Sequence, residues 1–245
     1  IFSVKNSDLT IFPSKSFSKL PVFKAKKKYV INHGVEDFFY QKIKKFKKFK
    51  KFYNSTKFKI LYLSKYEKYK NHHNLVKACN IVRQRGFNIS LDLVGVDENK
   101  IKNSLLYKDI ISFNNHNGKF INLKKIHSHK NLKKIYLKYD LHAYPSVCES
   151  FGIIILETIA SSLPIICSDL SVFKEILKKN SLYFDPFNPE DIAKKIIKFI
   201  INNNLRKKNT IKLYNLSKEY NWKKKSNETY NILLKNSKKH ISKID

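Results

Sequence analysis

The chain has 245 residues, of which 42% are hydrophobic, so it can bury a substantial core and is not expected to be disordered. Its 50 Lys and Arg residues and 19 Asp and Glu residues give a formal net charge of +31, which raises nucleic acid and anionic membranes as partners. Its 3 cysteines lack C-x-x-C spacing, and no apolar run approaches the ~20 residues of a membrane span, which argues against a disulfide framework, a zinc site and a spanning helix. We therefore expect a cytoplasmic chain in a reducing compartment, attached at most to the inner face of a membrane.

Residues 1–40 have the pattern of the end of a preceding domain. Residues 9–12 are predicted to form a short strand, after which Ser14 caps a helical turn. Residues 29–31 are predicted to form a second strand, and Gly34 is expected to supply a tight turn after it. This segment is thus expected to lead into the main domain.

Residues 41–56 form a basic, aromatic stretch. Phe46, Phe49 and Phe52 recur at every third position among lysines, which would place the rings along one stripe of a helix. Such a basic amphipathic helix suits the surface of an anionic membrane. The alternative, which we favour, is a linker between domains whose rings pack against the next domain.

Residues 57–220 are predicted to form a Rossmann-like domain. Residues 58–63 have the pattern of an apolar strand, residues 71–86 that of a helix ended by Gly86, and residues 89–94 that of a second strand. Strand, helix and strand within a few dozen residues imply a right-handed parallel crossover. We therefore expect an α/β fold in which helices flank a parallel sheet.

The remainder of the chain has less regular patterns. Further strands are predicted at residues 110–113, 141–144 and 164–167, with an edge strand and turn at 183–186, and further helices at 132–139, 152–160, 172–177 and 189–201. Residues 114–119 are predicted to form a loop, and the lysine-rich residues 221–245 a C-terminal helix. The neighbours His72 and His73, and the pair His127 and His129, lack a third ligand at a recognisable spacing, so we interpret them as packing or solvent-facing histidines.

The helix predicted at residues 152–160 is the centre of the chain. Its residues are apolar on every side, as in a helix that is buried all round, and Glu157 is out of place among them. A buried carboxylate needs either a cation or a polar ligand. Glu149 precedes the helix and would lie about 12 Å from Glu157 along its axis, a span that suits a nucleotide-sugar. The alternative is that Glu157 pairs with a lysine of a neighbouring element and that Glu149 is an ordinary acid at a helix start.

The N-terminus of this helix is a candidate anion site. Free N–H groups and the positive end of the helix dipole lie there, and Gly152 allows close backbone approach. Ser146 or Ser150 is expected to cap the helix. Lys65 and Lys70 follow the first strand of the domain, at the edge where open α/β sheets bind ligands, and two lysines there would hold a diphosphate.

Several motifs of the chain occur in the same order in one enzyme family. They are Glu149-Ser150-Phe151-Gly152 followed by four apolar residues and Glu157, then Ala160-Ser161-Ser162-Leu163-Pro164-Ile165-Ile166, then Glu175-Ile176-Leu177. This set resembles the signature of the family 4 retaining glycosyltransferases, the glycosyl transferases group 1 type. The resemblance implies the GT-B architecture of two Rossmann domains, with residues 1–40 as the end of the acceptor domain and residues 57–220 as the C-terminal, donor-binding domain.

The resemblance also implies a role for each site residue. Lys65 and Lys70 would contact the donor phosphates, although the family has Gly-Arg where this chain has Ser64 and Lys65. Glu149 would bind hydroxyls of the donor sugar, so that Glu149, Lys70 and Lys65 form the catalytic set, and Glu157 would bind the ribose. The remaining donor-binding residues are Ser150 and the four residues Phe151, Gly152, Ile153 and Ile154, whose backbone N–H groups would complete the site.

The expected function is transfer of a sugar from a UDP- or GDP-linked donor to a carbohydrate or lipid-linked acceptor. No metal and no cofactor are expected, and the group that deprotonates the acceptor is expected outside this chain. Two other functions stay open: a basic nucleic-acid-binding protein, and an inactive Rossmann-type interaction module, which Ser162 and Lys65 support because the family has Gly and Arg there. All basic residues except Arg83, Arg85 and Arg206 are lysines, so we expect no specific nucleic acid as a partner.

Overall fold

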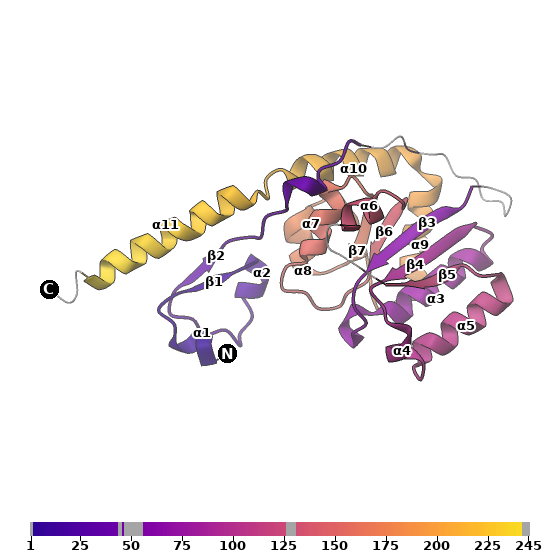
Figure 1. Cartoon of the computed structure of the whole chain (residues 1–245), viewed down its shortest axis with the longest axis horizontal. Coiled ribbons are helices and arrows are strands. Elements are labelled where there is room, and N and C mark those ends of the chain that lie inside the picture. Colours follow the sequence, from indigo (N-terminus) through magenta and orange to yellow (C-terminus); the bar gives the residue numbers. More distant parts are fainter. Residues whose placement is uncertain (1, 44–45, 47–55, 126–130, 242–245) are drawn as a thin grey trace.

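A computed structural model describes residues 2–43, 46, 56–125 and 131–241 of the chain. Figure 1 shows a small N-terminal part and a larger α/β part, and helix α11 (Trp222–Ile241) extends from the larger part alongside the smaller one. Asn236 of α11 joins the two, because its amide oxygen accepts from Lys27 Nζ at 3.1 Å and its amide nitrogen lies 3.4 Å from the Tyr29 hydroxyl.

The N-terminal part contains two short strands that pair in parallel, with Thr10 opposite Lys28. Its elements are α1 (Phe2–Asn6), β1 (Thr10–Phe12), α2 (Lys15–Ser18) and β2 (Lys28–Val30). Both predicted strands are present within one residue of their expected limits. The predicted cap is also confirmed, since Ser14 Oγ accepts a hydrogen bond from the Phe17 N–H at 3.1 Å.

The larger part is built on a parallel sheet of 6 strands in the order β5-β4-β3-β6-β7-β8. The strands are β3 (Phe58–Leu63), β4 (Ile89–Val94), β5 (Ile121–Lys124), β6 (Leu141–Tyr144), β7 (Ile165–Ser168) and β8 (Leu182–Phe184). Every residue of β4, β6 and β7 is buried, as expected for a parallel sheet with helices on both faces. This is the predicted α/β fold, with β8 as the predicted edge strand.

The strand order reverses between β3 and β6. The chain builds outward from β3 through β4 to β5, then returns to the other side of β3 and builds outward from β6 through β7 to β8. Right-handed crossovers on the two sides of this reversal run in opposite directions. The helices that follow β3 and β4 therefore cover one face of the sheet, and those that follow β6 and β7 cover the other. Ligands of open α/β sheets bind outside the carboxyl ends of the strands at this reversal.

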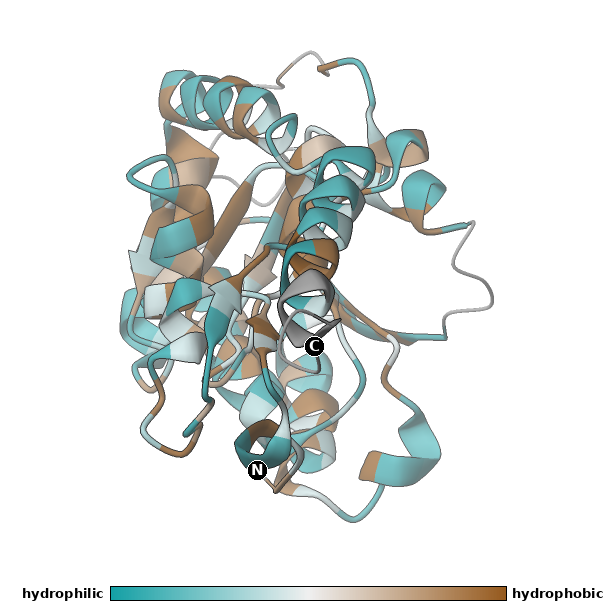
Figure 2. Cartoon of the chain, turned by 90° about the vertical axis from the view of Figure 1, so that its left-hand side faces the viewer, coloured by the Kyte–Doolittle hydropathy of each residue, from teal (hydrophilic) through white to brown (hydrophobic). Residues whose placement is uncertain are grey.

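The helices pack in two groups. Helix α3 packs against α5 and α9, and α7 packs against α10. Their bounds are α3 (His72–Gln84), α4 (Glu98–Ile101), α5 (Leu105–Asn117), α6 (Leu132–Tyr136), α7 (Ile153–Ala160), α8 (Ser171–Leu177), α9 (Pro189–Ile201) and α10 (Asn203–Ser217), with short 3-10 turns η1 (Asp37–Phe39) and η2 (Lys68–Lys70). Figure 2 shows some of the interior strands in brown, as hydrophobic, whereas α11, which ends at the label C, is mostly hydrophilic. Across the part of the chain that the structure covers, no helix is long and apolar enough to cross a bilayer.

The strand predicted at residues 110–113 is wrong. These residues lie inside α5, which Ser104 caps by accepting from the Tyr107 N–H at 3.2 Å. The helix buries Leu106 and Ile110, one turn apart, and short apolar runs do not separate this pattern from a strand. The predicted loop at residues 114–119 is accordingly wrong up to Asn117, where α5 ends, and the real strand of this unit is β5.

Two smaller predictions, on the end of one helix and on the role of Gly34, are wrong. The helix predicted to reach residue 139 ends at Tyr136. Gly34 forms no tight turn, and its small size matters because a Cβ there would lie 2.5 Å from the backbone nitrogen of Trp222. Ser162, which stands where the family has Gly, adopts a left-handed backbone with φ of 55°, and its hydroxyl donates to the Gln41 carbonyl at 2.9 Å. Most of the basic stretch at residues 41–56, and both His127 and His129, lie outside the described residues.

Candidate functional site

The predicted site residues gather where the strand order reverses. Lys65 and Lys70 follow β3, and Glu149 follows β6, which is the neighbouring strand. Helix α7 begins a few residues beyond Glu149 and carries Glu157. Two segments that are far apart in the sequence therefore meet at the carboxyl edge of one sheet, at the place where ligands of such folds bind.

Lys70 and Glu149 form a largely buried ion pair. Lys70 Nζ lies 2.5 Å from Glu149 Oε1, and the two side chains are 14% and 11% exposed. The Tyr144 hydroxyl donates to the same carboxylate oxygen at 2.8 Å. Removal from water strengthens such charge-assisted contacts and also makes them costly to break on one side alone, so the pair is held in one arrangement.

The turn that carries Lys70 is fixed by backbone contacts on both sides. The Val147 N–H donates to the Tyr69 carbonyl at 2.8 Å, which ties this turn to the loop before Glu149. The Tyr62 hydroxyl donates to the Lys70 carbonyl at 2.6 Å. Asn71 adopts a left-handed backbone with φ of 54°, and its side-chain amide donates to the Pro186 carbonyl at 2.6 Å. Lys70 is therefore placed by β3, β6 and the turn before α9 together.

Lys65 is not brought to this ion pair. Its side chain is exposed and lines a separate hollow of about 320 Å3 at the carboxyl ends of β3, β4 and β5. The residues that line this hollow are Lys65, Gly95, Val96, Asp97 and Lys125. Lys65 thus precedes the turn after β3, whereas Lys70 lies in this turn and contacts Glu149.

The N-terminus of α7 begins at Gly152, and the predicted serine cap is wrong. Gly152 occupies the cap position with φ of 93°, and no side chain caps the helix. Ser146 Oγ instead donates to the Tyr69 carbonyl at 3.3 Å, while Ser150 is exposed and its carbonyl accepts from Ser14 Oγ at 2.7 Å. Among the hydrogen bonds of the described residues, none uses the N–H groups of Ile153 or Ile154, so these groups can bind an anion.

The predicted donor-binding residues around this helix start differ in exposure. Phe151 is buried, with its ring 5.1 Å from that of His33, whereas Ile153 is 39% exposed. A Cβ at Gly152 would lie 3.2 Å from the Phe173 ring, and the positive φ adds strain for any other residue. Any other residue at Gly152 would therefore crowd the Phe173 ring at the helix start.

Glu157 is buried, with 5% of its surface exposed, and has a polar partner inside the protein. The Tyr136 hydroxyl of α6 donates to Glu157 Oε2 at 2.8 Å. Burial, and then the neighbouring carboxylate, raise the pKa of Tyr136 well above its ordinary value, so its hydroxyl keeps the proton that it donates. Sequence patterns predicted a partner for Glu157 but gave no reason to choose Tyr136, since a tyrosine in an apolar helix also fits the pattern of an ordinary core residue.

The N-terminal part reaches the same loop. Glu175 on α8 accepts from the N–H groups of Lys15 and Ser16 at 2.8 and 2.9 Å, and so caps α2 from outside. The contact between Ser14 and the Ser150 carbonyl places the start of α2 directly beside the Glu149 loop. The two parts of the chain therefore meet at the site.

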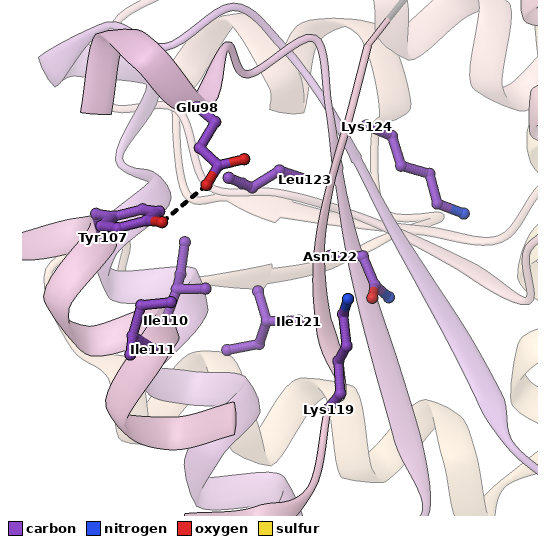
Figure 3. Close-up of a pocket in the computed structure, with 9 residues that line it drawn as sticks. All are labelled: Glu98, Tyr107, Ile110, Ile111, Lys119, Ile121, Asn122, Leu123 and Lys124. Carbon is purple, nitrogen blue, oxygen red and sulfur yellow. Dashed lines mark hydrogen bonds between the residues drawn. The ribbon is translucent and has the colours of Figure 1, made fainter. Parts of the chain in front are cut away.

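A larger hollow, of about 470 Å3, lies beside the edge strand β5 and α5 (Figure 3). Glu98 accepts a hydrogen bond there from the Tyr107 hydroxyl at 2.7 Å. Its lining residues are Glu98, Tyr107, Ile110, Ile111, Lys119, Ile121, Asn122, Leu123 and Lys124. None of the predicted site residues lines this hollow.

Comparisons with curated proteins point to sugar-transferring enzymes. The O-antigen chain mannosyltransferase RfbU of Salmonella typhimurium is 32% identical over 114 residues, 46% of this chain and 27% of that protein. The O-antigen chain mannosyltransferase B of Escherichia coli is 26% identical over 102 residues, 42% of this chain and 27% of that protein. The matches thus span about a quarter of these relatives.

Solved structures match over nearly the whole chain, and a family model matches most of it. HepE of Anabaena, solved with UDP-glucose, has a TM-score of 0.79 at 14% identity and covers 95% of this chain, which spans 65% of that one. Sucrose-phosphate synthase of Thermosynechococcus elongatus has a TM-score of 0.76 at 17% identity, with 95% of this chain and 59% of that one covered. Residues 43–216 match the model described as glycosyl transferases group 1. The chain therefore belongs to the glycosyl transferases group 1 family and has the α/β fold of GT-B glycosyltransferase structures.

Proposed function

We propose that this chain is the donor-binding half of a retaining glycosyltransferase that moves a sugar from a nucleoside diphosphate to a carbohydrate or lipid-linked acceptor. In this assignment residues 1–40 belong to the acceptor half and residues 57–220 to the donor half. The observation that carries the proposal is the contact between Lys70 and Glu149, which the strand reversal brings to within 2.5 Å beside the uncapped start of α7. The printed names of the relatives, mannosyltransferases and a structure with UDP-glucose, are consistent with such a donor.

The diphosphate of the donor would lie at the start of α7. The N–H groups of Ile153 and Ile154 and the positive end of the helix dipole favour an anion there. Lys70, which is paired with Glu149, would add an ammonium group that interacts with the same diphosphate. Because negative charge grows on the diphosphate as the sugar departs, fixed amides and an ammonium group that are already in place stabilise the transition state more than the ground state.

The two carboxylates would hold the two ends of the donor. Glu149 keeps one oxygen on Lys70 and Tyr144, and its remaining oxygen would accept from hydroxyls of the sugar. Glu157, which accepts from the Tyr136 hydroxyl, would also accept from hydroxyls of the ribose. Lys65 stands apart from this arrangement and would approach the donor from the hollow after β4.

The first test is whether the chain binds nucleotide-sugars through Lys70. Isothermal titration with UDP-glucose and GDP-mannose should show binding of one of them, and Lys70→Ala should weaken it by about 10- to 100-fold, as expected for loss of a hydrogen bond to a charged group. Lys77→Ala is the matched control, since Lys77 is an exposed lysine on the neighbouring helix α3.

Two results would contradict the proposal. One is an affinity for the bound sugar nucleotide that is the same in Lys70→Ala as in the original chain. The other is a lack of binding to any UDP- or GDP-linked sugar together with tight binding to oligonucleotides that falls steeply with salt, which would favour a nucleic-acid-binding protein.

A further inference from the structure

Tyr144, the last residue of β6, has a buried ring and a hydroxyl at the site. Its side chain is 1% exposed, and its ring packs at steep angles against Tyr62 and Phe173, with centroids 5.7 and 5.6 Å away. A buried tyrosine hydroxyl needs a polar partner, and here the partner is Glu149 Oε1 at 2.8 Å. Tyr144 therefore connects the aromatic interior of the sheet to a carboxylate that we place on the donor sugar.

Glu149 is held through one of its two oxygens. Lys70 Nζ and the Tyr144 hydroxyl both donate to Oε1, at 2.5 and 2.8 Å. The carboxylate cannot turn without giving up one of these donors. Among the described residues no group donates to Oε2, so this oxygen keeps its capacity to accept a hydroxyl from a ligand.

Tyr62 has the corresponding place on the lysine side of the ion pair. It lies on β3, next to β6, with 0% of its surface exposed, and its hydroxyl donates to the Lys70 carbonyl at 2.6 Å. The rings of Tyr62 and Tyr144 pack at 81° to one another. Two adjacent buried tyrosines thus each fix one member of the pair, Tyr62 through the backbone of Lys70 and Tyr144 through the side chain of Glu149.

Both hydroxyls stay protonated at neutral pH. Burial raises the pKa of Tyr62 and of Tyr144 well above the ordinary value of 10.0, and the charge of Glu149 acts in the same direction on both. Each hydroxyl therefore acts as a permanent donor to its oxygen rather than as a proton-transfer group.

We propose that Tyr144 is a positioning residue that makes the site recognise the sugar of the donor, by holding Glu149 so that Oε2 faces the sugar. Tyr62, acting through Lys70, has the corresponding effect on the diphosphate. This inference rests on the proposed donor site and adds that Tyr144 acts on recognition of the sugar and Tyr62 on that of the diphosphate.

The test compares a nucleotide with its sugar conjugate. Isothermal titration gives the affinities of the chain for UDP and UDP-glucose, and for GDP and GDP-mannose. Tyr144→Phe should weaken binding of the sugar conjugate about 10-fold and leave binding of the nucleotide within about twofold, because the lost hydroxyl bonds a charged group that contacts only the sugar. Tyr62→Phe should weaken both ligands by a similar factor.

A double-mutant cycle separates positioning from general damage. If Tyr144 acts through Glu149, then Tyr144→Phe should have no further effect on sugar discrimination in a Glu149→Ala chain. Tyr139→Phe is the matched control, because Tyr139 is also buried and donates to a carboxylate, Asp92 Oδ2, at 2.6 Å. It should lower the thermal midpoint to a similar extent and leave the ratio of the two affinities unchanged.

The inference is overturned if Tyr144→Phe leaves that ratio unchanged, if Tyr139→Phe shifts it equally, or if the effects of Tyr144→Phe and Glu149→Ala add. A different result would be that the unmutated chain binds none of the four ligands. It would overturn the donor-site proposal itself, and this inference with it.

Discussion

Glu157 illustrates at the scale of a residue how a carboxylate is kept inside an apolar helix. Five residues of α7 around it are buried, and Glu157 itself is 5% exposed. The Tyr136 hydroxyl donates to one oxygen at 2.8 Å, which offsets part of the cost of removing the charge from water. In the proposed function, binding of ribose hydroxyls is the reason for a carboxylate at this position.

Replacement of Glu157 tests this reason. Glu157→Ala should weaken binding of a nucleotide and of its sugar conjugate by the same factor, about 10-fold, because the ribose is common to both ligands. Isothermal titration of each ligand measures the two factors. Glu190→Ala, which removes an exposed carboxylate at the start of α9 that pairs with Arg85, is the control and should leave both affinities unchanged. Unaltered nucleotide binding in Glu157→Ala would remove Glu157 from the site.

At the scale of elements, His142 connects three elements around the candidate site, namely β6, β3 and α7. Lying on β6 with 0% exposure, it accepts the Leu63 N–H of β3 at Nε2, 3.3 Å away. Because Nε2 accepts, Nδ1 carries the proton and donates to Thr158 Oγ1 of α7 at 2.7 Å. Burial lowers the pKa of His142 to about 3, since a charged imidazole would lose both water and the bond from Leu63.

This buried histidine predicts a loss of stability in acid. Its pKa is about 3 in the folded chain and 6.5 ordinarily, so the unfolded chain takes up a proton first. The stability that the folded chain gains from keeping His142 neutral is full above pH 6.5 and is lost as the pH falls towards 3. Between pH 7 and pH 5 the original chain should lose about 2 kcal/mol more than His142→Asn, which has no titrating group.

Urea unfolding at the two pH values measures this difference. His72, whose pKa burial also lowers to about 3, is present in both proteins, so its contribution cancels. Equal losses of stability in the original chain and in His142→Asn would contradict the prediction.

The whole molecule consists of two parts whose contacts converge on the site. Glu175 caps α2, Ser14 binds the Ser150 carbonyl, and the His33 ring lies 5.1 Å from Phe151 and 5.8 Å from Trp222. Helix α11 then runs alongside the N-terminal part (Figure 1). The N-terminal part is therefore bonded directly to the loop that carries Glu149.

Loss of the Glu175 carboxylate should release this attachment. Glu175→Ala leaves the N–H groups of Lys15 and Ser16 without their acceptors, so these two amides should exchange with solvent at least about 10-fold faster, given the 1.5–3 kcal/mol of a hydrogen bond to a charged group. Hydrogen exchange followed by mass spectrometry or NMR measures the rates. Glu219→Ala removes an exposed carboxylate 3.8 Å from Lys178 and should not change them. Unchanged exchange in Glu175→Ala would show that Glu175 does not hold the two parts together.

Local patterns were sufficient for most elements and insufficient for a few. Apolar runs, a proline at the start of α9 and glycine at the end of α3 predicted those elements well, because the signals lie within a few residues of each other. Residues 110–113 were mistaken for a strand because a short apolar run fits either structure until its partners are known. Gly34 was mistaken for a turn residue because the close approach of Trp222 comes from a distant helix.

The sequence by itself determined the family, the α/β class and the two carboxylates on either side of a helix start, since these depend on spacing along one segment. The tertiary structure alone decided which lysine pairs with Glu149. Lys70 and Glu149 are 79 residues apart in the chain and meet only because the sheet reverses between β3 and β6, whereas Lys65 faces another hollow. It also decided that Tyr136, Tyr144 and Tyr62 donate to Glu157, Glu149 and the Lys70 carbonyl, because a buried aromatic residue looks like core until its hydroxyl has a partner.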